Sequence, residues 1–141
     1  MREMTHDEWH AFVLDGTRTG KLATTRANGH PHVAPLWFTL DSDDVIFTSG
    51  EGTAKGKALA RDPWVSLCVD DERPPFSFVV VEGTATITHD PDELLRWATA
   101  IGGRYMGDDA AEAFGRRNAV PTELLVRVTP TNVIARAAIA D

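Results

Sequence analysis

Short apolar segments separated by tight turns run through most of the chain, and this alternation restricts the fold more than any other feature. The segments that read as strands lie at 21–26, 32–40, 45–49, 64–70, 76–88, 123–129 and 132–137. Asn28-Gly29 predicts a type I′ hairpin turn, and such short connections allow only antiparallel pairing. Antiparallel meanders remove their exposed edges by closing into a barrel or forming a sandwich. Because helices interrupt the strands at only three places, we predict a small barrel in a single domain over residues 1–141.

Local signals mark the helices and two irregular points in the strands. Thr5 and Glu8 form a capping box for a first helix that ends at Gly16. Asp90 followed by Pro91 predicts the start of another helix, with one more at about 108–117. Glu82-Gly83 predicts a bulge within the longest strand, and Pro130 predicts a hinge between the two closing strands.

Charge and cysteine content exclude several classes of protein. The 14 basic and 21 acidic side chains give a net charge of −7, which disfavours general binding of nucleic acid. No apolar run approaches the roughly 18–20 residues that a membrane helix needs. The single cysteine, Cys68, excludes an internal disulfide and any cysteine-rich metal site. With its polar and acidic first residues, the chain is expected to be cytoplasmic, without nucleic-acid or membrane partners.

One strand predicts self-association. Residues 76–81 read Phe-Ser-Phe-Val-Val-Val and are apolar on both faces. One face can fill the barrel, whereas the other needs cover from outside the domain. A homodimer interface is the natural source of that cover.

Residues 48–63 carry the most informative local chemistry. A strand ends in a glycine-rich turn, and Thr53 can cap a helix of roughly eight residues that ends before Pro63. Lys55 and Lys57, two of the three lysines of the chain, lie in its first turn. Free N–H groups and the helix dipole make such a start suitable for phosphate. The segment is therefore either a phosphate clamp or a solvated helix start whose lysines face water.

Other motifs are weaker. A glutamate at position 51 and an alanine at position 58 exclude a nucleotide P-loop around Gly56-Lys57, and no Rossmann glycine motif is present. His30 and His32 could share one strand face, but no third ligand is spaced to join them, and we expect no metal site.

The ordered motifs of the chain resemble those of the pyridoxamine-phosphate-oxidase-like split β-barrels. The similar segments are residues 20–25, 28–38, 53–63, 81–85, 104–107 and 127–130. The similarity is greater to the actinobacterial branch of deazaflavin (coenzyme F420)-dependent oxidoreductases. It implies a mainly β protein with flanking helices, a six-stranded antiparallel split barrel, and a homodimer with two cofactor sites at the subunit interface.

The same resemblance implies which residues contact the cofactor. Lys55 and Lys57 would hold its phosphate and acidic tail, although some relatives have arginine at the positions of Lys57 and Thr53. The remaining implied cofactor-binding residues are Pro35, Leu36, Trp37 and Phe38 below the ring, Thr48 and Ser49 along the ring or ribityl chain, Thr53 and Ala54 at the helix start, and Phe76, Ser77 and Phe78 from the partner subunit.

The resemblance implies hydride transfer from the reduced deazaflavin to an electron-poor double bond of a small organic substrate. The cofactor carries the reactive centre, and the sequence therefore predicts no particular catalytic residue. Two alternatives remain open: an FMN-dependent oxidase or reductase on the same barrel, and a non-catalytic flavin- or haem-binding module.

Overall fold

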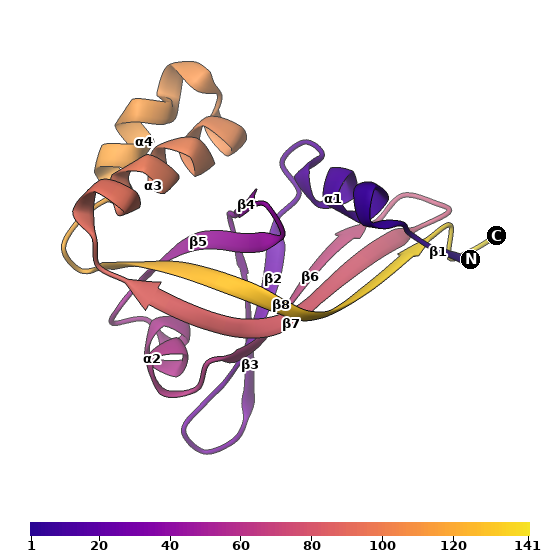
Figure 1. Cartoon of the computed structure of the whole chain (residues 1–141), viewed down its shortest axis with the longest axis horizontal. Helices are drawn as coiled ribbons and strands as arrows, with labels where there is room; N and C mark the ends of the chain where they lie inside the picture. The colour runs from indigo at the N-terminus through magenta and orange to yellow at the C-terminus, as the bar shows by residue number, and fades with distance from the viewer.

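A single antiparallel sheet of eight strands forms the body of the computed structural model, which describes residues 1–141 (Figure 1). The strands are β1 Arg2–Glu3, β2 Gly20–Thr25, β3 Pro31–Leu36, β4 Thr39–Asp41, β5 Asp44–Gly50, β6 Trp64–Asp71, β7 Ser77–Thr88 and β8 Glu123–Ala137. Their order is β3-β2-β6-β7-β8-β5-β4, with β1 paired to β8. The two ends of this order, β3 and β4, are joined by only Trp37 and Phe38, so the sheet curls back on itself as a barrel.

The barrel interior is filled by residues that alternate along the strands, as expected where one sheet face is buried. The most deeply buried large side chains of this core include Leu22, Phe38, Phe47, Leu67 and Val126. Trp9 and Val13 of the first helix join the same cluster. The core therefore closes the barrel and fixes one helix to it.

Four α-helices flank the sheet: α1 His6–Leu14, α2 Ala54–Arg61, α3 Pro91–Met106 and α4 Ala111–Asn118, with a 3₁₀ turn, η1, at Asp108–Ala110. In Figure 1, the α3–α4 hairpin lies above the sheet and α2 lies below it. The predicted capping box is confirmed, because the Thr5 hydroxyl accepts from the Glu8 N–H and the Glu8 side chain accepts from the Thr5 N–H. No helix is both long enough and apolar enough to cross a membrane.

The fold class is confirmed, but the expected strand number is wrong: the sheet has eight strands and not six. Two additional short strands arise because β1 pairs with the end of β8 and because the predicted strand 32–40 breaks at Trp37-Phe38 into β3 and β4. The hinge predicted at Pro130 is also wrong. Strand β8 is continuous, and Pro130 lies opposite Gly83. The register shifts between Glu82 and Gly83, where the sequence predicts an irregularity, but the extra residue, Thr131, belongs to β8 and not to β7.

Two local expectations need correction. The β2–β3 hairpin has three residues between Arg26 and His30. The Arg26 N–H donates to the His30 carbonyl at 2.9 Å, and only Gly29 of the loop has a positive φ, of 84°. A type I′ turn needs two residues with positive φ, whereas a three-residue loop ends with a glycine in this conformation. Phe76, expected to begin β7, precedes it with a φ of 62°.

Candidate functional site

The start of helix α2 provides the N–H groups that the sequence predicts. Thr53 caps the helix: its hydroxyl accepts from the Gly56 N–H at 3.0 Å and donates to the Gly50 carbonyl at 2.8 Å. The Lys57 N–H bonds to the Thr53 carbonyl. The N–H groups of Ala54 and Lys55 have no acceptor and are available to an anion.

Close packing fixes this helix start against the end of β5. A Cβ atom on Gly56 would overlap the carbonyl oxygen of Gly50, so only glycine allows this approach. Ser49 is buried beneath the turn, with its hydroxyl 3.4 Å from that of Thr53. The two free N–H groups therefore belong to a rigid junction rather than to a loose helix end.

The charges at this junction favour an anion. Of the three lysines, only Lys21 forms an ion pair, with Asp70 at 2.9 Å. Lys55 is half-buried and Lys57 is exposed, so both ammonium groups are free to meet a ligand. The residues present thus fit a phosphate or a carboxylate tail.

Glu123 is a component of this junction that sequence reasoning missed. It pairs with Gly50 across β5 and β8, a long-range contact that no local motif indicates. Burial raises the pKa of Glu123, while a hydrogen bond with Thr48 and the charge of Lys55 act in the opposite direction. Glu123 thus lies close enough to Lys55 for their charges to interact, and it is the acidic side chain to consider in any test of anion binding at this junction.

The predicted ring-binding segment, residues 35–38, divides between the core and the surface. The Leu36 and Phe38 side chains are buried in the barrel core, so only their backbone can face a ligand. Pro35 is exposed and Trp37 is half-exposed. The Trp37 ring stacks on the ring of Tyr105 from α3, with centroids 5.0 Å apart and an interplanar angle of 4°.

Two residues of α3 hold this segment in place. Arg104 donates to the carbonyls of Val13, Gly16 and Phe38 at 2.7, 3.1 and 2.7 Å. The Tyr105 hydroxyl donates to the Arg18 carbonyl at 2.8 Å and accepts from the Phe38 N–H at 3.3 Å. Helix α2 packs against β3, and α3 against β4. Both parts of the candidate site therefore border β5: the helix start packs on Gly50, and the aromatic pair lies at the link that enters β4, the pairing partner of β5.

The remaining predicted residues, Phe76, Ser77 and Phe78, lie away from α2 in the same chain. Helix α2 leads into β6 at Trp64, which pairs with Thr84, whereas Phe78 pairs with Asp70. That is six residue steps along β6, or about 20 Å. The Ser77 hydroxyl is occupied by the Ala138 N–H at 3.2 Å. A single chain thus brings together the groups around Lys55 and Trp37, but not these three residues.

Comparison with known proteins agrees with this architecture. A family model described as Pyridoxamine 5'-phosphate oxidase matches residues 5–137. The conserved hypothetical protein Rv2991 from Mycobacterium tuberculosis superposes with a TM-score of 0.82 and 26% identity over 94% of this chain and 84% of that chain. A structure named F420 Reductase superposes with a TM-score of 0.69 and 25% identity over 87% of this chain and 94% of that chain.

A third similar structure is a FAD-binding protein from Mesorhizobium loti, with a TM-score of 0.70 and 20% identity over 95% of this chain and 93% of that chain. At this identity the similarity concerns the fold alone. The family includes oxidoreductases. Because its family model spans nearly all of the strands and helices described above, the chain belongs to the pyridoxamine 5'-phosphate oxidase family of split β-barrels, as its sequence motifs predict.

Proposed function

We propose that the protein is a cytoplasmic, homodimeric oxidoreductase that uses reduced coenzyme F420. When bound, this deazaflavin supplies a hydride to an electron-poor double bond of a small organic substrate, and a proton from solvent completes the reduction. The chain's own task is to bind and orient the two partners. The single observation that carries the proposal is the free, lysine-bearing start of α2 at one end of a surface that leads to Trp37.

The anionic part of the cofactor is assigned to α2. The N–H groups of Ala54 and Lys55 have no acceptor within the chain, and the ammonium groups of Lys55 and Lys57 form no ion pair. Charge-assisted hydrogen bonds of this kind contribute roughly 1.5–3 kcal/mol each. In a protein with a net charge of −7, this junction offers a local attraction for an anion.

The planar part of the cofactor is assigned to the link between β3 and β4. The Trp37 side chain, supported from behind by Tyr105, offers an aromatic surface beside the backbone of Pro35 and Leu36. Thr48 adds a half-buried hydroxyl at β5. We assign the opposite wall to the partner subunit's Phe76, Ser77 and Phe78, because these residues lie far from α2 within one chain.

Replacing both lysines by alanine tests the anion assignment. We predict that Lys55→Ala/Lys57→Ala weakens F420 binding at least about tenfold, or about 1.4 kcal/mol, and leaves the fold unchanged. Dissociation constants are measured by quenching of tryptophan fluorescence during titration with F420. The matched control is Arg96→Ala/Arg116→Ala, which removes two exposed positive charges from the α3–α4 hairpin. Equal dissociation constants for the two double variants would disprove the clamp.

A parallel experiment separates F420 from the alternative cofactors. The protein is purified, its absorption spectrum is recorded, and it is titrated with FMN and with F420. A yellow protein that retains FMN and does not bind F420 would contradict the proposal and indicate an FMN enzyme. A haem absorption band would contradict it and indicate a haem-binding module. Oxidation of reduced F420 in the presence of electron-poor alkenes would support the proposed reaction.

A further inference from the structure

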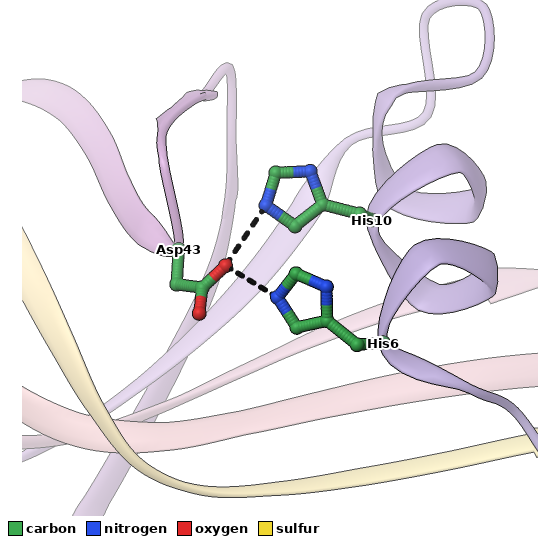
Figure 2. Close-up of side chains that lie close together, drawn as sticks. All are labelled: His6, His10 and Asp43. Atoms are coloured by element: carbon green, nitrogen blue, oxygen red, sulfur yellow. Dashed lines mark hydrogen bonds and ion pairs between the residues drawn. The ribbon is translucent and has the colours of Figure 1, made fainter.

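Two histidines of α1 and one aspartate of the β4–β5 turn form a cluster that the proposed function does not use. His6 and His10 lie four residues apart and therefore project from the same face of the helix. Figure 2 shows both imidazole rings pointing at Asp43, whose side chain points back at them. The Nε2 atoms of His6 and His10 lie 2.7 and 3.1 Å from the same oxygen, Oδ1.

These distances suit the coordination of one metal ion. Metal–nitrogen and metal–oxygen bonds of about 2.0–2.2 Å place neighbouring ligand atoms about 2.8–3.4 Å apart, for angles between octahedral and tetrahedral. All three ligand atoms lie within 4.8 Å of one another. An ion could therefore enter with small side-chain rotations and no change of backbone.

The surroundings favour the correct form of each ligand. The second nitrogen of His6, Nδ1, lies 3.4 Å from Asp7 Oδ1. Without an ion, Nε2 donates to Asp43 at 2.7 Å; when an ion replaces that proton, Asp7 can accept from the Nδ1–H and orient the ring. The neighbouring aspartates, Asp41 and Asp44, are both bound to Arg127, at 2.9 and 3.0 Å, whereas Asp43 contacts no cation other than histidine.

Open space adjoins the cluster. A cavity of about 270 Å³ is lined by Glu3, Met4, His6, Trp9, Val133, Ala135 and Arg136. His6 and Asp43 are about half exposed, so solvent reaches the ligand atoms. A bound ion would consequently retain coordination positions for water or for a small ligand.

We propose that Nε2 of His6, Nε2 of His10 and Oδ1 of Asp43 form a binding site for one divalent transition-metal ion of the zinc, nickel or copper class. Imidazole and carboxylate ligands suit this class, and copper(II) should bind most tightly. The ion joins α1 to the β4–β5 turn. The site lies at the opposite end of β5 from α2, about 20 Å away, and is independent of the cofactor assignment.

Calorimetric titration of the untagged, full-length protein with zinc, nickel and copper salts tests the site. We expect one ion per chain, a rise in melting temperature when it is bound, and a loss of at least tenfold in affinity for each of His6→Gln, His10→Ala and Asp43→Asn. The matched control is His89→Ala, which removes an exposed imidazole from outside the cluster and should not change binding.

A second measurement follows ion binding in the intact protein. Trp9 packs against both imidazole rings, with centroids 5.5 Å from His6 and 5.0 Å from His10. Copper(II) bound to the cluster should therefore quench Trp9 fluorescence, and Trp9→Phe should remove that part of the quenching. The proposal is overturned if the intact protein binds no ion stoichiometrically, or if His10→Ala, folded by circular dichroism, binds as well as the intact protein.

Discussion

At the scale of a single residue, Tyr105 holds the aromatic end of the candidate site in place. Its hydroxyl connects the α1–β2 loop with the β3–β4 link, and its ring supports Trp37. Burial raises the pKa of Tyr105, so the hydroxyl remains a protonated donor at neutral pH. Nothing in the local sequence around Tyr105 indicates these two backbone hydrogen bonds, because their partners lie far away in the chain.

Tyr105→Phe removes these two hydrogen bonds and keeps the stacked ring. We predict a loss of about 1–3 kcal/mol in the free energy of unfolding, because the Phe38 N–H loses its acceptor in a partly buried place. Urea denaturation measures the change. Thr131→Val, which removes an exposed hydroxyl bond to Glu82, is the matched control and should change stability by less than about 0.5 kcal/mol. Equal losses in the two variants would contradict this role of Tyr105.

At the scale of the element, helix α2 shows which structural features can be predicted from the sequence. Its start and end follow from Thr53 and Pro63, because capping and proline effects act within a few residues. Its contact with β5 depends on Gly56 meeting the backbone of Gly50, six residues earlier but on another element. No local rule distinguishes this glycine from a poor helix residue.

Gly56→Ala separates helix propensity from packing. In an open helix this change stabilises by up to about 1 kcal/mol. Here the added Cβ would overlap the Gly50 carbonyl, so we predict destabilisation of about 1–3 kcal/mol, read as a lower melting temperature. The matched control is Gly52→Ala, where the added Cβ meets no atom within 4 Å. A more stable Gly56→Ala protein would show that α2 is not fixed against β5.

The same distinction between local and distant contacts explains what the sequence predicts for the whole fold. The capped helix starts at Thr5 and Asp90 have local causes and are confirmed, and the register shifts at the predicted Glu82-Gly83. The Glu123 contact and the cluster around Asp43 join segments far apart in the chain. The four-residue spacing of His6 and His10 on a predicted helix indicates two of the three proposed ligands. No local pattern indicates the third, Asp43.

At the scale of the whole molecule, a row of apolar side chains on the outer face of the barrel supports the prediction of a dimer. Val79 and Val81 of β7 are buried in the core, so Val80 between them points outward. It pairs with Cys68 on one side and Ile134 on the other. Phe76, at the start of the same segment, is 40% exposed. These side chains are the surface that a second copy would cover.

We therefore predict a dimer in solution, measured by light scattering at micromolar concentration. Val80→Glu places a charge in the apolar row and should give a folded monomer that also binds F420 more weakly, because the proposed site needs both subunits. Thr86→Glu, on an exposed position of the same strand, is the control and should stay dimeric. A monomeric wild-type protein would contradict both the interface and the shared site.

Strand β8 has a consequence for the order in which the protein is built. It is the pairing partner of β1, β5 and β7, yet it follows every other strand along the chain. During synthesis the ribosome releases β5 and β7 well before residues 123–137, so both wait with an unsatisfied edge. Pairs such as β2–β3 and β6–β7 can form earlier, but the barrel cannot close until this last segment emerges.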